Sequence, residues 1–307
     1  VSRALSKHPN VLKETRDAVQ KRARELGYVK NAAAKAMRGD DTQIVGLLLP
    51  NILNDFYARF ANTMALACEA RSLQLIIHLT GDEKSAEEKA LQRLHEVQAQ
   101  GVIMVPTPGS ANPELPHLKA MSVIQLIRQC DIGYPTPAIL VDDQKALRKA
   151  VVHLAKKGHS QIAYIGADSG LSSGRIRLAA FRAGLADAGI KEVPSLIRTD
   201  PPSAELGFDC TARLLKGKDA TALVCGGVEI SNGALKALIG AGKGALDLFD
   251  FIGYGDPSYY SWIGGGVSTI AVPVEDLAFK AVDLLVNPLP ITSENTHRFE
   301  AFFITRN

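Results

Sequence analysis

From residue 44 onward, short apolar runs alternate with helical stretches, and this alternation limits the fold more than any other feature of the sequence. The runs that predict strands are Ile44–Leu49, Leu73–Leu79, Gly101–Val105, Val123–Ile127, Ile162–Ile165, Thr221–Cys225 and Phe249–Gly253. Apolar residues spaced about 3.6 apart predict helices over 57–71, 85–98, 144–157 and 174–188. Alternating strands and helices indicate parallel sheets with helices on both faces. The segment is too long for one ordinary sheet, so we expect two α/β subdomains.

The loops that follow these strands hold the candidate ligand-binding residues. Open parallel sheets bind their ligands beyond the carboxyl ends of the strands. In the loops at those ends, the residues able to stack on or hydrogen-bond to a small molecule are Asn54, Phe56, Tyr57, Arg128, Gln129, Asp168, Arg175, Arg177, Tyr259, Tyr260 and Trp262. The sequence therefore predicts a small-molecule site at the strand ends.

The sequence motifs give little support to an enzyme. The glycine-rich stretches fit neither G-x-G-x-x-G nor the phosphate-binding loop, and H-E-x-x-H does not occur. The seven histidines are scattered, and the four cysteines are far apart, without a C-x-x-C pair. We expect no enzymatic activity, no cofactor and no metal site. Because we find neither a membrane-length apolar run nor a leader-like start, we expect a cytoplasmic protein.

Charge is distributed unevenly along the chain. Residues 1–38 carry a net charge of +7, whereas the remaining 269 residues carry −4. A basic segment at one end of an acidic body indicates an anionic partner, and we favour nucleic acid. The alternative is a solvated helical face, although such faces usually mix both signs.

The basic segment also carries family motifs. Residues 1–39 read VSRALSKHPNVLKETRDAVQKRARELGYVKNAAAKAMRG. This stretch resembles the second half of the DNA-binding domain of the LacI/GalR (lactose-repressor-like) transcription factors. The matching features are VSRAL at the end of a recognition helix, a third helix ending in ELGY, and a hinge helix. Lys30 stands where that family often has proline, and Met37 stands at its usual leucine.

The resemblance implies how this segment binds DNA. In the family, the hinge helices of two subunits pair on the operator, and each inserts an apolar side chain into the minor groove, a role that suits Met37. Small residues such as Ala34 allow the close helix approach. The residues expected to contact DNA are Ser2, Arg3, Tyr28, Asn31, Ala34 and Met37. The alternatives are an ordinary amphipathic linker helix and, for Arg3, an exposed charge at a helix end.

The likeness continues along the rest of the chain, where LPNILNDFYARF, HLAKKGHSQIAYIG and FIGYGDPSYYSW are similar to family segments. It implies a type I periplasmic-binding-protein fold: two Rossmann-like subdomains joined by three crossovers, behind a partial helix-turn-helix head. We expect the head at 1–30, the hinge helix and linker at 31–43, and the regulatory domain at 44–307. The first subdomain would comprise about 44–141 and 271–290, and the second about 142–270 and 291–307.

Several residues fall on positions where this family binds its effector. The expected effector-binding set is Asn54, Phe56, Tyr57, Arg128, Gln129, Arg177, Gly227, Asp256 and Trp262. Arg177 falls on the arginine that commonly grips the ligand, although Arg177 and Arg175 could also form a solvated loop pair. Asn54, Phe56 and Tyr57 fall on a polar-then-aromatic loop that stacks the ligand, although Phe56 could be a core residue.

Departures from the family pattern bear on the chemistry of the effector. Arg128 and Gln129 replace the Asp-Arg of many sugar-binding members, Gly227 and Val228 replace Asn-Asp, and Gly255 stands at a usual aspartate. At least two carboxylates that would accept hydrogen bonds from sugar hydroxyls are thereby lost.

Two arginines are expected to face the same cleft. Arg128 and Arg177 would approach it from opposite subdomains, and paired guanidinia suit a carboxylate or phosphate. We therefore expect a sugar acid or another organic acid as the effector, in preference to a neutral sugar. The alternative is that Arg128 forms a salt bridge with Asp131 or Asp142.

As a whole, the resemblance implies a dimeric, effector-controlled transcriptional regulator that acts as a repressor. Its partners would be operator DNA, a small-molecule effector and a second copy of the chain. Because Val1 falls inside the recognition helix, we expect the chain as given to bind DNA poorly. The alternatives are a stand-alone solute-binding protein of the same fold, which predicts a leader peptide, and an α/β enzyme, which predicts a nucleophile–base pair.

Overall fold

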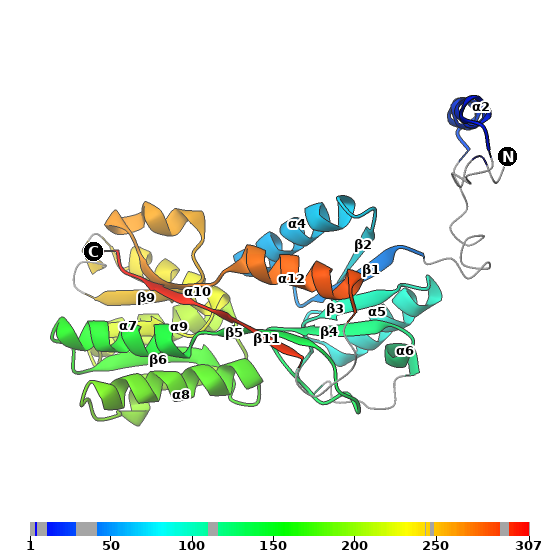
Figure 1. The fold of residues 1–307 in the computed structure, drawn as a ribbon. Coiled ribbons are helices and arrows are strands. Elements are labelled where there is room, and N and C mark those ends of the chain that lie inside the picture. Colours follow the sequence, from blue (N-terminus) through cyan, green and yellow to red (C-terminus); the bar gives the residue numbers. More distant parts are fainter. Residues whose placement is uncertain are drawn as a thin grey trace. The chain divides into compact units, whose positions relative to one another are not determined.

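The computed structural model describes Ala4 and residues 11–28, 42–109, 116–242, 244–245, 249–288 and 295–306. Its contacts divide the chain into two units, residues 1–42 and residues 43–307, which Figure 1 draws in the colours of the sequence. Of the expected hinge helix and linker at 31–43, residues 31–41 lie outside the described residues.

The described part of the first unit is centred on helix α2 (Lys13–Glu25). The helix ends at a left-handed turn, where Gly27 has a φ of 62°. The Tyr28 backbone N–H donates to the Ala23 carbonyl at 2.8 Å, and the Gly27 N–H donates to the Arg24 carbonyl at 3.1 Å. This is the bonding pattern of a glycine C-cap, and it explains why the helix stops before Tyr28.

The second unit begins with a parallel six-stranded sheet. Its strands, in spatial order, are β11 (Thr296–Glu300), β5 (Ala138–Asp142), β4 (Ser122–Leu126), β3 (Gly101–Met104), β1 (Ile44–Leu49) and β2 (Gln74–Leu79). The helices that accompany them are α4 (Asp55–Glu69), α5 (Lys84–Glu96), α6 (Pro116–Lys119) and α12 (Val274–Val286). Every residue of β1 is buried, as expected for a central strand covered on both faces. Helix α12 packs beside α4 although more than 200 residues separate them in sequence (Figure 1).

A second six-stranded sheet follows. Its strands are β12 (Phe302–Ile304), β10 (Ser268–Ala271), β9 (Asp250–Tyr254), β8 (Ala222–Cys225), β6 (Ile162–Ala167) and β7 (Ile197–Asp200), and only β12 among them runs antiparallel to its neighbour. Its helices are α7 (Gln144–Lys156), α8 (Ser172–Asp187), α9 (Ala204–Gly217) and α10 (Val228–Gly240), with short 3-10 turns η1 (Pro194–Leu196), η2 (Ser258–Ser261) and η3 (Ile263–Gly265). Tyr164 packs with the core that includes α7 and α8, whereas Ala163 and Ile165 pack with the core that includes α9 and α10. Alternate residues of β6 therefore bury on opposite faces.

The chain passes between the two sheets three times. The passages lie at Asp143 between β5 and α7, at Val272 between β10 and α12, and at Ala301 between β11 and β12. Two of the passages touch, because the Ala301 backbone N–H donates to the Asp142 carbonyl at 2.9 Å. The two subdomains are therefore joined by three crossovers, two of which are hydrogen-bonded to each other.

The strands and helices predicted from the sequence are confirmed, with ends displaced by no more than two residues. One expected boundary is wrong. Residues 291–307 were assigned to the second subdomain, but β11 pairs in parallel with β5 from Thr296 to Glu300 and so belongs to the first sheet. Only β12, after Ala301, lies in the second sheet. The sequence of β11 does not indicate which sheet it joins, because the pairing of residues 296–300 with residues 138–142 is decided by the tertiary fold.

Candidate functional site

A cleft of about 730 Å³, open on one side, lies where the carboxyl ends of the two sheets meet. The loops after β1, β2 and β4 supply one wall, and the loops after β6, β7 and β8 supply the other. Val141 and Val272, beside the first two crossovers, line the cleft as well. Its position, beyond the carboxyl ends of parallel strands, is that of a small-molecule site at the switch point of α/β sheets.

The expected effector-binding residues divide into two groups. Asn54, Phe56, Tyr57, Arg128, Arg177 and Gly227 line the cleft. Gln129, Asp256 and Trp262 are not among its lining residues. The cleft thus brings together residues that lie up to 173 positions apart in the sequence, from 54 to 227.

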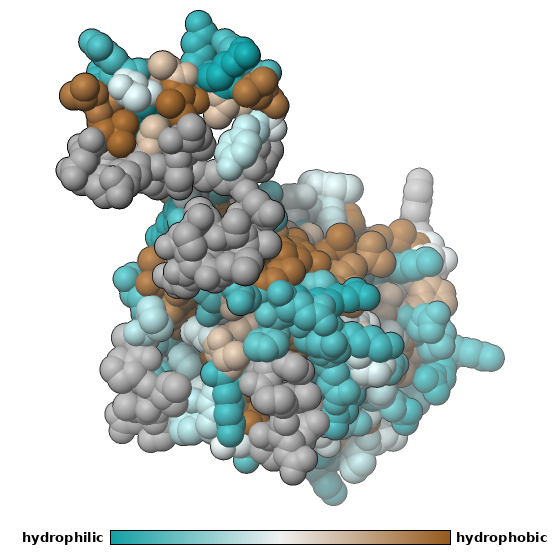
Figure 2. Space-filling model, turned by 90° about the vertical axis from the view of Figure 1, so that its right-hand side faces the viewer, coloured by the Kyte–Doolittle hydropathy of each residue, from teal (hydrophilic) through white to brown (hydrophobic). Residues whose placement is uncertain are grey.

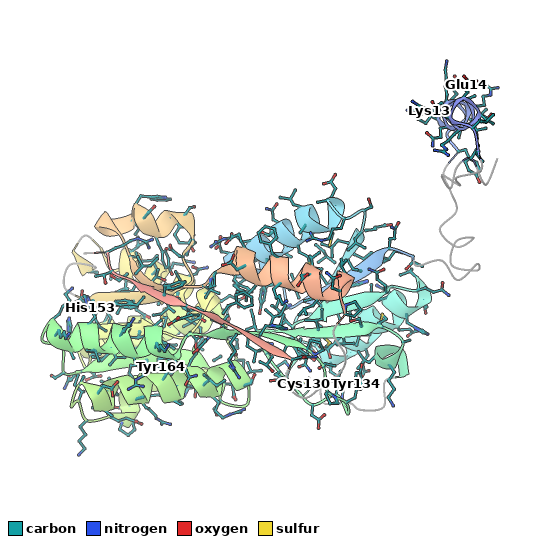
Figure 3. All side chains as sticks on the ribbon, in the orientation of Figure 1. Lys13, Glu14, Cys130, Tyr134, His153 and Tyr164 are labelled. Carbon is teal, nitrogen blue, oxygen red and sulfur yellow. The ribbon has the colours of Figure 1, made fainter. Side chains whose placement is uncertain are left out.

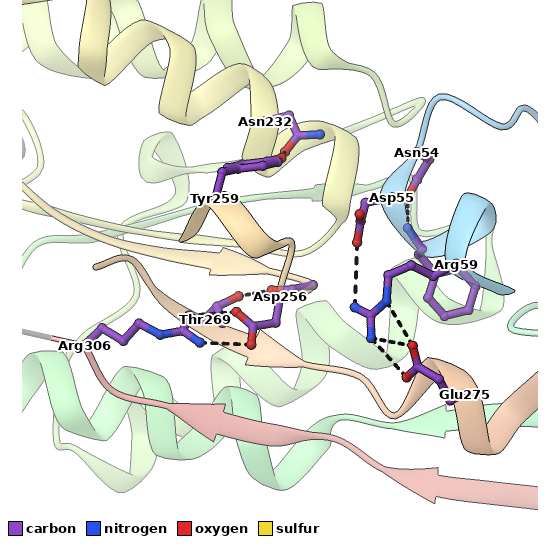
Figure 4. Close-up of polar contacts among 11 residues, drawn as sticks. Asn54, Asp55, Arg59, Asn232, Asp256, Tyr259, Thr269, Glu275 and Arg306 are labelled. Carbon is purple, nitrogen blue, oxygen red and sulfur yellow. Dashed lines mark hydrogen bonds and ion pairs between the residues drawn. The ribbon is translucent and has the colours of Figure 1, made fainter. Parts of the chain in front are cut away.

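The three residues outside the cleft are engaged elsewhere. Asp256 forms a two-pronged ion pair with Arg306, with distances of 2.7 and 2.9 Å (Figure 4). Trp262 is 70% exposed and meets the edge of the Tyr259 ring. Gln129 lies at the rim, where its backbone N–H donates to the Ser172 hydroxyl at 3.2 Å. In this structure these three residues do not line the cleft, so a role for them in effector binding stays a prediction.

The aromatic loop of the first wall is positioned by the cap of α4. The Asn54 side chain accepts a hydrogen bond from the Phe56 N–H at 3.0 Å and so caps the helix (Figure 4). The Phe56 and Tyr57 rings meet edge to face, with centroids 5.5 Å apart. Burial raises the pKa of Tyr57 to about 12, so its hydroxyl stays protonated at neutral pH.

Arg128 is paired with a carboxylate that the sequence analysis did not name. Its two terminal nitrogens bind the two oxygens of Asp82 at 2.5 and 3.1 Å. The alternatives considered from the sequence, Asp131 and Asp142, are therefore wrong for this conformation. Asp82 lies directly after β2, at the same sheet edge as Arg128, and a systematic inspection of every strand end would have found it.

Arg177 has an even more buried partner. Its Nε donates to Asp143 Oδ2 at 2.6 Å, and its Nη1 donates to the Gly226 carbonyl at 3.1 Å. The Tyr254 hydroxyl donates to the same Asp143 oxygen at 2.6 Å. The guanidinium carbon also lies 4.1 Å from the centre of the Tyr254 ring. Arg177 therefore enters the cleft from a fixed cluster of buried polar groups.

Glu229 is a second acidic residue of the cleft, after Asp82, that the sequence analysis did not name. It lies in the first turn of α10, and its Oε1 accepts from the side-chain amides of Asn51 at 2.8 Å and Asn54 at 3.4 Å. The cleft therefore does contain carboxylates, those of Asp82 and Glu229, although they stand at other positions than the ones expected from the family pattern.

Residues 170–174 read Gly-Leu-Ser-Ser-Gly, which has the G-x-S-x-G spacing of a hydrolase nucleophile elbow, a match that the sequence analysis passed over. Ser172 begins α8 after β6, so the strand–turn–helix context is present. The Ser172 hydroxyl accepts from the Gln129 backbone N–H, and none of the residues that line the cleft is a histidine. Within the described residues, no hydrogen bond joins the Ser172 hydroxyl to a side chain that could act as its general base.

Of the residues expected to contact DNA, only Tyr28 lies within the described part of the chain. It is 58% exposed, at the end of α2. The other expected contacts, Ser2, Arg3, Asn31, Ala34 and Met37, lie outside the described residues.

Comparison with known proteins decides the family. Residues 42–298 match the model for periplasmic binding proteins and the sugar binding domain of the LacI family. This chain belongs to the LacI/GalR family. Its fold is the type I periplasmic-binding-protein fold, and the resemblance noted from the sequence is confirmed.

The curated relatives of this LacI-family chain are transcriptional regulators. Catabolite control protein A of Streptococcus mutans is 25% identical over 93% of this chain and 85% of the relative. The HTH-type transcriptional regulator GalR of Escherichia coli is 24% identical over all of this chain and 90% of the relative. None of these names denotes an enzyme.

Solved structures show the same fold. A lac repressor dimer bound to operator and the anti-inducer ONPF superposes with a TM-score of 0.83 at 20% identity, covering 99% of this chain and 93% of that one. A probable LacI family regulator from Corynebacterium glutamicum gives a TM-score of 0.76 at 24% identity, covering 85% of this chain and 97% of that one. Within the described residues of the LacI-family chain, no helix has the length and apolar character needed to cross a membrane.

Proposed function

We propose that this LacI-family chain is a transcriptional repressor whose affinity for operator DNA is set by a small molecule bound in the cleft. The observation that carries the proposal is the cleft itself, which takes walls from both subdomains and lies beside the crossovers. A ligand that contacts both walls binds one relative orientation of the subdomains better than others, and it thereby shifts their equilibrium.

The DNA-binding end of the molecule is proposed from the sequence and the relatives. We assign residues 1–30 to the DNA-binding head and 31–43 to the hinge helix and linker. The net charge of +7 over residues 1–38 supports binding to the phosphate backbone. An operator-binding protein acts where the chromosome is, so we propose a cytoplasmic location.

We propose a homodimer formed partly through the face made by α4 and α12. Leu66 on α4 is 61% exposed, and Phe279 and Val286 on α12 are 53% and 42% exposed. These two helices pack against each other, and Figure 2 shows apolar residues gathered along one side of the regulatory domain. An apolar face of this kind is typical of a surface that is covered in the assembled protein.

For the effector we propose a hydroxylated organic acid, such as a sugar acid. Its hydroxyls would donate to Asp82 or Glu229, and its carboxylate would accept from Arg177, whose Nη2 has no hydrogen bond to another described residue. The arrangement differs from the two open arginines expected from the sequence, because Arg128 already binds Asp82 with both terminal nitrogens. Arg177 is therefore the arginine that carries the proposal.

The experiment is a thermal-shift screen with D-galactose, D-ribose, D-gluconate, D-galacturonate, glucose 6-phosphate and citrate. A ligand that binds only the native state raises the melting temperature by mass action. We expect a shift with D-gluconate or D-galacturonate that Arg177→Lys weakens strongly. Arg182→Ala is the matched control, since Arg182 lies on the same helix and pairs with Glu192 outside the cleft. A shift only with the neutral sugars would overturn the acidic effector.

The DNA-binding proposal is tested separately, with a protein in which a whole helix-turn-helix precedes the hinge helix and the regulatory domain. Binding sites selected from random duplexes should be palindromic, as a dimer requires. Their affinity should fall steeply with salt, and adding the effector found in the screen should change it. A complete protein that selects no sequence at low salt would contradict the regulator proposal.

A further inference from the structure

Hydrogen bonds cross the effector cleft at its rim. Asn51 follows β1 in the first subdomain, and Glu229 lies in the first turn of α10 in the second. The Asn51 side-chain nitrogen donates to Glu229 Oε1 at 2.8 Å, and the Asn54 nitrogen donates to the same oxygen at 3.4 Å. One carboxylate oxygen of the second subdomain is therefore held by two amides of the first.

The two amides are held in the orientation that these bonds need. Asn51 Oδ1 accepts from the Leu53 and Asn54 backbone N–H groups, both at 3.0 Å. Asn54 Oδ1 accepts from the Phe56 N–H at 3.0 Å. With both oxygens used by the local turn and the helix cap, both side-chain nitrogens are left to donate across the cleft. The turn after β1 thus presents a preformed pair of donors.

Glu229 differs from Asp82, which also lines the cleft, and from Asp143, which lies behind it. Asp82 is paired with Arg128 inside the first subdomain, and Asp143 is paired with Arg177 behind the cleft. Among the described residues, Glu229 has only the two amides as hydrogen-bond partners. Hydrogen bonds to an ionised group are stronger than neutral ones, and these exist only while the subdomains are close together.

A third hydrogen bond crosses the cleft, at another point of the rim. The Gln129 backbone N–H, after β4, donates to the Ser172 hydroxyl at the start of α8. This bond is neutral, exposed and 3.2 Å long, so it adds less than the charged bond at Glu229. The two contacts belong to different loops, and together they tie both walls of the cleft.

We propose that Asn51 and Glu229 form a latch that holds the cleft closed in the ligand-free protein. Glu229 is then a positioning residue of the effector site, because it fixes the separation of the walls that a ligand must contact. The consequence for effector binding rests on the proposed function, whereas the closure itself does not. The latch can therefore be tested without any ligand.

The test measures the distance between two spin labels by pulsed electron resonance in ligand-free protein. Unnatural residues carry the labels at exposed Lys84 on α5 and exposed Ser169 before α8, so the native cysteines stay untouched. Asn51→Asp places a carboxylate against Glu229 while keeping the oxygen that caps the turn. We expect the main distance to lengthen, because two like charges repel across the rim.

The rescue variant makes the test specific. In Asn51→Asp combined with Glu229→Gln, the glutamine amide donates to the new aspartate, so the bond is restored with its direction reversed. We expect the distance to return to that of the parent protein. Glu275→Gln is the matched control, because Glu275 pairs with Arg59 within the first subdomain (Figure 4), and the distance should not change.

The outcomes separate the latch from the proposed function. An unchanged distance in Asn51→Asp, or a folded double variant that fails to close again, overturns the latch. If Asn51→Asp does not fold, Glu229→Ala replaces it. This variant removes the acceptor without adding a charge, and the distance between the labels should lengthen in it as well. A distance that responds as expected supports the latch, even if no compound in the thermal-shift screen binds.

Discussion

Arg177 Nε lies 2.6 Å from Asp143 Oδ2, and Asp143 is the residue at which the chain first passes from one sheet to the other. Arg177 lines the cleft, so a ligand that displaces its guanidinium also disturbs the crossover at Asp143. The exposed fractions of the two side chains are 10% and 2%. The contact is therefore a buried ion pair that connects the cleft to the first crossover between the subdomains.

Asp143→Ala should destabilise the protein strongly, because it leaves the Arg177 charge buried without its carboxylate partner. Breaking one side of a buried pair costs about 3–5 kcal/mol of unfolding free energy. Urea denaturation followed by circular dichroism measures this loss. Asp187→Ala is the control, since Asp187 pairs with exposed Arg148 and its removal should cost about 0–1 kcal/mol. Equal effects at the two positions would show that the Asp143 pair is not special.

Gly226→Ala should destabilise the protein by overpacking its core. A Cβ at this position would collide with the Tyr164 hydroxyl, whose side chain is fully buried in the second subdomain (Figure 3). We expect a loss of about 1–3 kcal/mol. Tyr164→Phe should recover part of it, because the Tyr164 hydroxyl has no hydrogen-bond partner among the described residues. In Gly240→Ala, where no atom lies within 4 Å of the added carbon, stability should not fall.

Asp250 should make the protein sensitive to acid. Burial raises the pKa of this carboxyl, but hydrogen bonds from Lys157 and His159 outweigh it and leave the pKa below the usual 3.8. A carboxyl with a depressed folded pKa stabilises the protein above its unfolded pKa, and that contribution is lost as the pH falls through the folded value. The difference in unfolding free energy between the parent and Asp250→Asn should therefore shrink below pH 3.8. A difference independent of pH would contradict this account.

Tyr57 should ionise only in strong alkali. Burial raises its pKa to about 12, from a usual value of 10.0. Since the raised pKa favours the neutral phenol in the folded state, its contribution to stability should be lost as the pH rises from 10 through 12. A tyrosine-labelled NMR titration, with Tyr57→Phe to assign the signal, measures the midpoint. A midpoint near 10 would show that water reaches the phenol.

The elements were predictable because they depend on local patterns. The buried run of β1 and the apolar spacing of α8 are both legible in a single stretch of sequence. The cleft residues Asn54, Phe56 and Tyr57 were also accessible, because they directly follow a strand and the carboxyl end of a strand is where ligands bind.

The partners of those residues were not predictable in the same way. Arg128 could have paired with any nearby acid. Its pairing with Asp82 depends on the carboxyl ends of β2 and β4 lying on the same side of the sheet, although β1 and β3 separate the two strands. Asp256 follows a strand end as the other candidates do, but it pairs with Arg306, 50 residues away, and does not line the cleft. Such choices are made by tertiary packing, which a single sequence does not display.

A single residue, Ala301, separates β11 in the first sheet from β12 in the second. Neither half of the regulatory domain is therefore a continuous piece of chain, and each receives its last strand from the segment around residue 300. A ribosome that has made only the preceding part has released two sheets with unfinished edges, at β5 and β10. Open strand edges can pair with another chain, so we expect the nascent protein to be prone to aggregation until the segment around residue 300 has emerged.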